Sequence, residues 1–127
     1  MQRSNHASGG KWEGIVGYSR VVRVGPFVYV SGTTAADESG HVSGDAYEQT
    51  ARTLDNLQRA LASAGARIED VVRTRMFVKN IDDWEAVARA HGAVFGAVRP
   101  AATMVEVSRF ITPEMLVEIE ADAVVTS

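Results

Sequence analysis

The sequence predicts an α+β fold, in which two helices cover one face of a mainly mixed β-sheet. Two stretches have helical periodicity, and short β-rich segments precede, separate and follow them. The length agrees, because 127 residues with 46% hydrophobic content suit one compact domain. Residues 1–10 are polar and contain glycine and serine, so we expect a flexible tail ahead of a single domain over residues 11–127.

The first two predicted strands form a hairpin. Residues 21–24 are rich in valine, Gly25-Pro26 marks a tight turn, and residues 27–31 are again β-formers that end at Gly32. The second strand has large apolar residues on both alternating faces. This pattern favours a homo-oligomer that covers the second face, and coverage by loops of the same chain is the alternative.

The first helix is predicted from an apolar stripe between a capping signal and a stop signal. Asp45 or Ser43 can cap it, it runs to about Ala64, and Gly65 ends it. Its stripe recurs at three- and four-residue steps, as an amphipathic helix requires. The stripe comprises Tyr47, Thr50, Leu54, Leu57, Leu61 and Ala64.

The second helix runs from a cap at Asp82 to Phe95, before Gly96. His91 lies on its apolar stripe, which favours a packed or interfacial histidine over a catalytic one. Strands are predicted on either side of this helix. They cover residues 71–78, 103–110 and 115–125.

Charged residues alternate along two of these strands. Glu118, Glu120 and Asp122 share one face of the last strand, and Arg73 and Arg75 share one face of strand 71–78. If the strands are neighbours, these groups form an ion-pair ladder, in which each exposed pair contributes about 0–1 kcal/mol. Alternatively, an Arg–Glu combination at a subunit boundary is a ligand site, with a carboxylate acting as an acid or water-orienting base.

Composition argues against several other functions. The formal net charge of −3 provides no basic field for nucleic acid. Cysteine is absent, and the three histidines are too widely spaced for a metal-ligand pattern. No apolar run is long enough to span a bilayer or to form a signal peptide, so we expect a cytoplasmic protein without a membrane partner.

Ordered motifs from Gly17 onward resemble the RidA/YjgF family, also called endoribonuclease L-PSP. Each motif is weak alone, but their order and spacing together are specific. The matching segments are Gly17-Tyr18-Ser19-Arg20 with Val24-Gly25, Phe27 to Thr33, Gln49-Thr50 through Leu57, Ala64-Gly65-Ala66 with Glu69 to Thr74, Arg99 to Val107, and Val117 to Ala121.

This resemblance implies a chorismate-mutase-like two-layer sandwich, with a mixed six-stranded sheet, two helices on one face and a homotrimeric assembly. Ligand sites in the family lie in clefts between subunits. Characterised enzymes of the family hydrolyse reactive enamines and imines formed from amino acids, and they release ammonia without a metal or organic cofactor. The resemblance therefore implies a small-molecule ligand and no cofactor.

The resemblance also implies roles for individual residues. Tyr18 would line the cleft, Ser31 and Gly32 would offer hydroxyl and backbone contacts, and Glu118 would position or activate water as the catalytic group. Thr103 stands where the family has serine or threonine after its substrate-binding arginine.

That arginine is replaced by Ala102 in this chain. Alanine has no donor for a substrate carboxylate, so selection of free amino-acid-derived substrates should be weak and ordinary family deaminase activity is in question. Arg75 is the first candidate to replace the arginine, and Arg99, three residues from Ala102, is the second. Arg75 could equally be a cross-strand partner of Glu118 or Glu120.

The sequence thus leaves two main functional hypotheses. One is a cofactor-free hydrolase or deaminase that acts on imine-type C–N bonds. The alternative is a non-catalytic metabolite-binding trimer that uses the same clefts. Ribonuclease activity, which the older family name suggests, is less favoured because the chain lacks a basic and aromatic patch.

Overall fold

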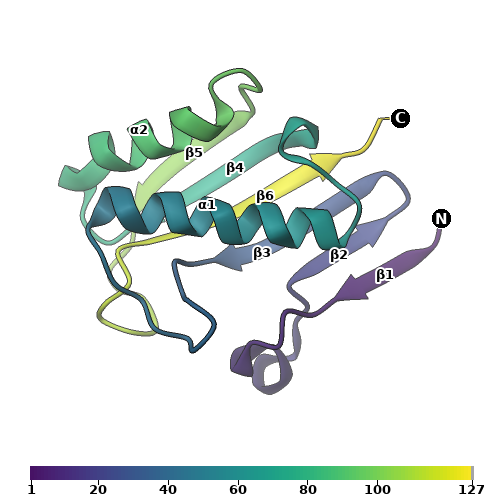
Figure 1. The fold of residues 1–127 in the computed structure, drawn as a ribbon, viewed down its shortest axis with the longest axis horizontal. Helices are drawn as coiled ribbons and strands as arrows, with labels where there is room; N and C mark the ends of the chain where they lie inside the picture. Colours follow the sequence, from purple (N-terminus) through teal and green to yellow (C-terminus); the bar gives the residue numbers. More distant parts are fainter. Residues whose placement is uncertain (127) are drawn as a thin grey trace.

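The computed structural model describes residues 1–126 and has two main helices against one mixed sheet of six strands (Figure 1). This arrangement confirms the predicted fold class. The strands are β1 (Arg3–His6), β2 (Val21–Val24), β3 (Phe27–Thr33), β4 (Val71–Val78), β5 (Ala101–Glu106) and β6 (Val117–Val124). The helices are α1 (Ala46–Ser63) and α2 (Trp84–Phe95), and shorter helical turns cover Glu13–Gly17, Ile68–Asp70 and Ile81–Asp83.

The last strand of the chain lies in the middle of the sheet. The spatial order is β1-β2-β3-β6-β4-β5, so β6 pairs with both β3 and β4. All neighbouring pairs are antiparallel except β4 and β5, which are parallel and connected through α2 (Figure 1). Residues of β6 therefore have neighbours on both sides, which a strand at the sheet edge would lack.

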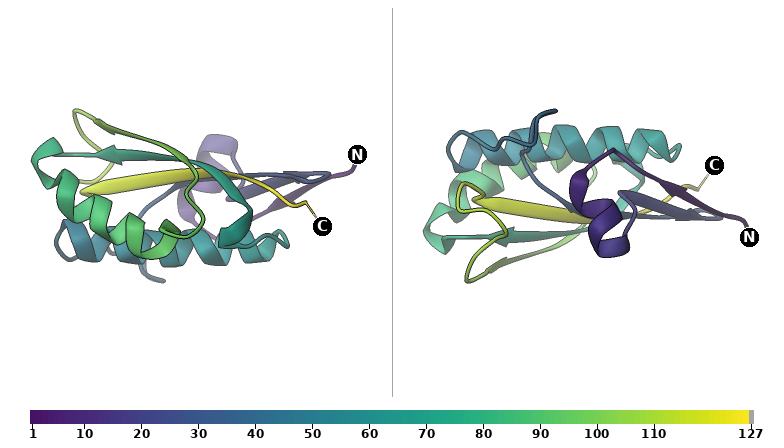
Figure 2. Two further views of the ribbon diagram at one scale, coloured as in Figure 1. Left: turned by 90° about the horizontal axis from the view of Figure 1, so that it is seen from above. Right: turned by 90° about the horizontal axis from the view of Figure 1, so that it is seen from below.

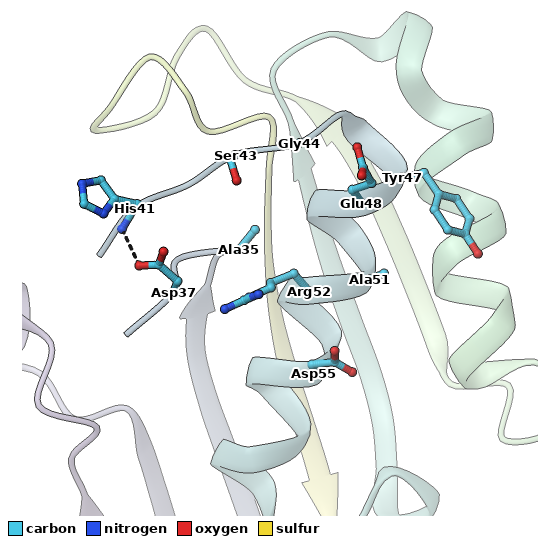
Figure 3. A pocket seen from close by; sticks show the side chains of 10 residues that line it. All are labelled: Ala35, Asp37, His41, Ser43, Gly44, Tyr47, Glu48, Ala51, Arg52 and Asp55. Atoms are coloured by element: carbon cyan, nitrogen blue, oxygen red, sulfur yellow. Dashed lines mark hydrogen bonds between the residues drawn. The ribbon is translucent and has the colours of Figure 1, made fainter. Parts of the chain in front are cut away.

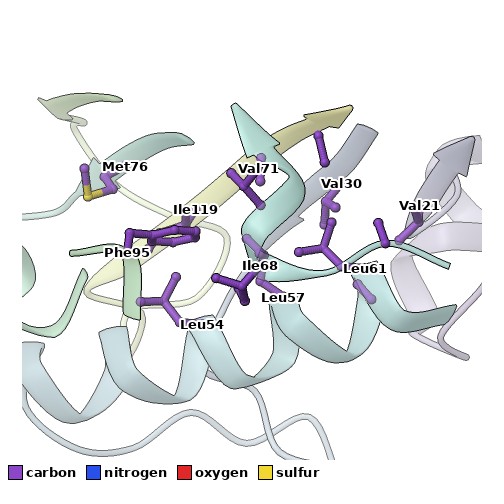
Figure 4. Packing of buried hydrophobic residues seen from close by; sticks show 14 of the residues in the cluster. Val21, Val30, Leu54, Leu57, Leu61, Ile68, Val71, Met76, Phe95 and Ile119 are labelled. Atoms are coloured by element: carbon purple, nitrogen blue, oxygen red, sulfur yellow. The ribbon is translucent and has the colours of Figure 1, made fainter. Parts of the chain in front are cut away.

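The hydrophobic core lies between the helices and one face of the sheet. Leu54, Leu57 and Leu61 of α1 are at most 1% exposed, and they pack with Phe95 of α2 and Ile119 of β6 (Figure 4). Alternation along β6 places its apolar residues under the helices and its acidic residues on the opposite face, as predicted. Burial of these three leucine side chains is the main contribution of α1 to stability.

Figure 2 shows both helices on one side of the sheet. We call the opposite side the open face. It bears Phe27, Tyr29, Arg73, Arg75, Phe77, Thr103, Val105, Glu118, Glu120 and Asp122. Phe27 and Tyr29 are 40% and 48% exposed, so loops of the same chain leave these aromatic side chains in contact with solvent.

The N-terminal residues differ from the prediction. Arg3–His6 form the edge strand β1, paired with β2 from Arg3↔Val24 to His6↔Val21, where the sequence predicted a flexible tail. The segment Arg-Ser-Asn-His is polar at every position, and backbone hydrogen bonds to β2 rather than apolar burial hold it in the sheet. Hydrophobic periodicity therefore has no signal for this strand.

The end of β5 and the start of β6 also differ from the prediction. β5 ends at Glu106 rather than at Phe110, and β6 begins at Val117 rather than at Met115. The Val107 N–H still donates to the Val78 carbonyl of β4 at 2.8 Å, and the residues between Val107 and β6 lie outside the sheet. Residues 107–110 and 115–116, which were predicted as strand, instead belong to a connection. Val107, Arg109 and Phe110 of this connection line a hollow described below.

The capping residue predicted from the sequence is correct for α1 and wrong for α2. At α1, Asp45 accepts from the Glu48 N–H at 2.9 Å and Glu48 accepts from the Asp45 N–H at 3.0 Å, which confirms the predicted cap. At α2, the predicted cap residue Asp82 instead lies in the turn Ile81–Asp83 and donates its N–H to the Asn80 side chain. The residue before α2 is therefore Asp83, and the helix begins at Trp84, one residue later than a cap at Asp82 predicts.

Replacing Asp45 with alanine should lower the free energy of unfolding by about 1 kcal/mol, because the Glu48 N–H in the first turn of α1 loses its side-chain acceptor. Urea denaturation of the two proteins measures this difference. Asp55→Ala is the matched control, since Asp55 is exposed within the same helix and makes no side-chain hydrogen bond among the described residues. Equal losses in both variants would contradict the capping role.

Candidate functional site

A hollow of about 420 Å³ lies on the open face where β3, β4 and β6 meet the segment that follows β5. We call it the Glu118 hollow. β6 contributes two carboxylates, and the other walls contribute aromatic, aliphatic and guanidinium groups. Its lining residues are Gly32, Phe77, Val107, Arg109, Phe110, Glu118 and Glu120.

Glu118, which lines this hollow, has a shifted pKa. Burial raises the pKa of its carboxyl above the ordinary value of 4.5, the Arg20 guanidinium partly opposes this rise, and the Glu120 carboxylate adds to it. A carboxyl with a raised pKa holds a proton at higher pH than an exposed one. Glu118 can therefore donate a proton as well as accept one, as acid–base chemistry on a small molecule requires.

Gly32 makes room for this carboxyl group. The pairing of β3 with β6 shifts register between Val30 and Thr33, and Gly32 lies in this irregular stretch. A Cβ atom at Gly32 would lie 2.6 Å from Glu118 Oε2, closer than side-chain contacts allow. Any larger residue would thus displace the carboxyl group of Glu118 from its position.

Arg20 connects Gly32 to Tyr18. Its Nη1 donates to the Gly32 carbonyl at 2.6 Å and to Thr33 Oγ1 at 3.3 Å, and its Nη2 donates to the Tyr18 hydroxyl at 3.2 Å. The side chain is only 16% exposed. The sequence analysis did not select Arg20 as a site residue, although its place directly after Tyr18 and Ser19 in the first matching motif was a usable signal.

A buried acidic residue lies behind Arg20. Glu13 Oε2 is 3.9 Å from Arg20 Nε. Burial alone would raise the pKa of Glu13, but hydrogen bonds from Ser8 and the charge of Arg20, with a further bond from the Gly10 N–H, together lower it. Glu13 is therefore a counter-charge for the Arg20 guanidinium.

Ser31 lies beside this cluster with its hydroxyl already engaged. Its Oγ donates to the Ser19 carbonyl at 2.6 Å, and its N–H donates to the Arg20 carbonyl at 3.0 Å. These bonds attach the irregular stretch of β3 to the segment before β2. Ser31 therefore supports the position of Gly32, and its hydroxyl keeps acceptor capacity for a ligand.

Arg75 forms ion pairs on the open face. Its Nη1 lies 3.3 Å from Glu120 Oε1 and 3.2 Å from Asp122 Oδ2. Arg75 is directly opposite Glu120 in the register of β4 and β6. The cross-strand alternative considered for Arg75 is thus present in the chain, with Asp122 rather than Glu118 as the second partner.

The residues around the missing arginine lie elsewhere. Ala102 and Thr103 are in the edge strand β5, opposite Thr74 and Arg75 respectively. Since adjacent strand positions face opposite ways, Ala102 and Arg75 are on opposite faces of the sheet within one chain. Neither Ala102, Thr103 nor Arg99 lines the Glu118 hollow. Arg99 has a left-handed backbone (φ 58°), and its side chain donates to the Gly96 carbonyl at 3.4 Å.

His91 belongs to the other side of the sheet. Its Nε2 lies 2.9 Å from Thr74 Oγ1, and its ring centroid lies 4.7 Å from that of Phe95. Burial lowers the pKa of His91, which favours the neutral ring. This packed position agrees with the structural interpretation of His91 and places it outside the Glu118 hollow.

A second hollow, of about 440 Å³, lies between α1 and the segment before it (Figure 3). Two of its carboxylates bond to the chain itself. Asp37 accepts from the N–H of His41 at 2.9 Å, which lowers the pKa of Asp37, and Glu48 accepts from the Asp45 N–H at 3.0 Å. Its walls are Ala35, Asp37, His41, Ser43, Gly44, Tyr47, Glu48, Ala51, Arg52 and Asp55.

Over residues 1–126, no three or more histidine, cysteine, aspartate or glutamate side chains are grouped so that they could hold a metal ion. Within the same residues, no helix has the length and apolar character needed to cross a membrane.

Comparison with known proteins identifies the family. The family model described as Endoribonuclease L-PSP matches residues 11–125. In fold, the chain superposes with a TM-score of 0.90 on a YjgF-family protein from Mycobacterium tuberculosis, with 47% identity over 98% of this chain and 100% of that one. The chain belongs to the RidA/YjgF family.

Relatives of this RidA/YjgF chain include named enzymes. It is 38% identical over 108 residues to a RutC family protein of Pyrococcus abyssi, covering 84% of each chain. It is 34% identical over 111 residues to the 2-iminobutanoate/2-iminopropanoate deaminase of Salmonella typhimurium, covering 84% of this chain and 86% of that one. The family resemblance inferred from the ordered motifs is therefore confirmed.

Proposed function

We propose that this RidA/YjgF chain is a cofactor-free hydrolase of small imines or enamines. The observation that carries the proposal is Glu118, a carboxyl whose pKa is raised by burial in the wall of a hollow sized for a metabolite. The names of its deaminase relatives support the same reaction class.

The reaction converts an imine and one water into a carbonyl compound and ammonia, so it needs proton transfers and no change of oxidation state. Protonated Glu118 donates its proton to the imine nitrogen and becomes a carboxylate. The carboxylate then accepts a proton from the water that adds to the imine carbon. That proton passes to the nitrogen of the tetrahedral intermediate. The C–N bond then breaks with loss of ammonia, and the hydroxyl proton returns to the Glu118 carboxylate as the carbonyl forms.

We also propose that the functional unit is a homotrimer, as the family resemblance implies, with the hollow closed by a neighbouring subunit. The support is the open face, where Phe27, Tyr29 and Val105 are 40–48% exposed although they belong to strands. Covering the hollow would also exclude water and strengthen its electrostatic interactions. Sedimentation should give three times the chain mass, and a monomer would contradict an intersubunit site.

A non-catalytic, metabolite-binding trimer is the second candidate. The observation that favours it is Ala102, which has no donor at the position of the family's substrate-binding arginine. Such a protein would bind small ligands in the same hollow without accelerating their hydrolysis.

One assay separates the two functions. Imino acids with different side chains are generated in situ by an amino-acid oxidase, and release of ammonia and the 2-oxo acid is followed with and without the protein. We expect acceleration that increases with protein concentration for at least one imino acid. Binding of 2-oxo acids without any acceleration would instead support the metabolite-binding trimer.

A further inference from the structure

The Glu118 hollow contains one guanidinium that the sequence analysis did not consider. Arg109 lies in the segment between β5 and β6 and lines the hollow together with Glu118 and Glu120. This segment begins where the Val107 N–H bonds to β4, and it returns to the sheet where the Lys79 N–H bonds to the Leu116 carbonyl at 3.0 Å. Arg109 is therefore held at the rim by a connection fixed at both ends.

The arginines near the hollow differ in what already neutralises them. Arg75 is paired with Glu120 and Asp122, and Arg20 donates to the Gly32 carbonyl and lies near Glu13. Arg109 makes no side-chain hydrogen bond or ion pair with any of the residues 1–126 that the structure describes. Binding an anion at Arg109 thus requires no internal ion pair to break, whereas binding at Arg75 does.

The remaining walls are apolar. Phe77 of β4 lies opposite Glu118 in the strand register, and Phe110 and Val107 come from the same segment as Arg109. Phe77, Phe110 and Val107 are all partly buried, so each presents a limited apolar surface to the hollow. Such surfaces favour an aliphatic or aromatic substituent over a polar one of the same size.

We propose that Arg109 is the specificity-determining residue that binds the anionic group of the ligand in place of the arginine missing at position 102. The ligand class is a small carboxylic acid with an imine or enamine nitrogen and an apolar side chain. Its carboxylate lies on the Arg109 guanidinium, its nitrogen faces Glu118, and its side chain contacts Phe77 and Phe110. This inference rests on the proposed function, because it assigns the substrate of the same site.

The carboxylate is a better match for Arg109 than a neutral group. A guanidinium has five N–H donors in a planar arrangement and binds both carboxylate oxygens at once. The Glu120 carboxylate, which also lines the hollow, repels a second anionic group, and protonated Glu118 donates to the ligand nitrogen. The charge distribution therefore sets the orientation of the ligand as well as its affinity.

The experiment compares 4-methyl-2-oxopentanoate, a 2-oxo acid of the product class, with its methyl ester, which lacks the negative charge. Calorimetric titrations use the wild-type protein, Arg109→Gln, Arg109→Lys, Arg75→Gln and Arg67→Gln. Arg67 is the matched control, since its side chain is 71% exposed in a turn outside the hollow. Melting temperatures of all variants verify folding, and imine hydrolysis is measured in parallel.

We expect Arg109→Gln to weaken binding of the acid by roughly 10- to 100-fold, to leave the ester unchanged, and to be partly rescued by Arg109→Lys. Arg67→Gln should bind as the wild type does. Loss of acid binding in Arg75→Gln but not in Arg109→Gln would overturn the assignment and leave the proposed function intact. If the wild-type protein bound the acid and the ester equally well and still accelerated hydrolysis, the assignment of Arg109 would be overturned and the proposed function would stand. A wild-type protein that neither binds the acid nor accelerates hydrolysis would overturn both.

Discussion

Glu118→Gln should reduce imine hydrolysis by about 100-fold or more and should make the folded protein more stable at pH 7. The loss of activity follows because the amide can neither donate nor accept the proton that the reaction transfers. The gain in stability follows because the amide is neutral, whereas burial disfavours the charged form of Glu118. Steady-state kinetics and thermal denaturation measure the two effects.

The pH dependence of stability tests the same residue independently. The pKa of Glu118 is raised in the folded protein, so its stabilising contribution is complete below the unfolded value of 4.5 and is lost as the pH rises through the folded pKa. The wild type should therefore match Glu118→Gln near pH 4 and become less stable than the variant towards pH 7.

Asp122→Asn is the matched control for Glu118→Gln. Asp122 lies on the same face of β6, pairs with Arg75 and does not line the Glu118 hollow. Its replacement should lower stability by about 0–1 kcal/mol and change turnover little. A similar loss of turnover in both variants would contradict a specific role for Glu118.

Arg20→Ala should lower the free energy of unfolding by about 2 kcal/mol, because it removes three hydrogen bonds from a charged donor and leaves the Gly32 carbonyl without that partner. It should also move the alkaline limb of the activity profile to higher pH, because the reaction starts from protonated Glu118. Arg20 lowers the pKa of Glu118, so its removal raises that pKa further. Urea denaturation and a pH–rate profile measure the two effects.

Two variants separate stability from electrostatics. Arg23→Ala also removes hydrogen bonds from a partly buried arginine, to the carbonyls of Ala64 and Gly25, and Arg23 does not line the hollow. It should lower stability without moving the pH profile. Arg20→Lys should keep much of the wild-type profile because it retains the charge. A profile unchanged in Arg20→Ala would show that Arg20 has no electrostatic effect on Glu118.

Most elements could be predicted because their signals are local. β4 has the predicted bounds Val71–Val78, and α1 starts at the predicted cap Asp45. In both cases neighbouring residues alone specify the backbone, through alternation in the strand and reciprocal hydrogen bonds at the cap. β1 could not be predicted this way, because its pairing partner β2 lies about 18 residues further along the chain and its own side chains are polar throughout.

The candidate site was predicted unevenly. The family motifs selected Tyr18, Gly32 and Glu118, and the structure places Gly32 and Glu118 in contact and connects Tyr18 to them through Arg20. Arg109 was missed because residues 103–110 were predicted as one strand, in which it would be an ordinary charged position. The binding roles of Tyr18, Ser31, Arg75 and Thr103 stay predictions.

By itself, the sequence determined the family, the two-layer fold and the acidic face of the last strand. Motif order and spacing can be followed along the chain, and side-chain alternation can be followed within one strand. Only the tertiary structure decided which charges meet. Strand order places β6 between β3 and β4, and register then joins Arg75 to Glu120 and Asp122. The irregular pairing at Gly32 admits the Glu118 carboxyl, and the end of β5 at Glu106 sends Arg109 to the rim of the hollow. These outcomes depend on contacts between distant segments, which no local pattern encodes.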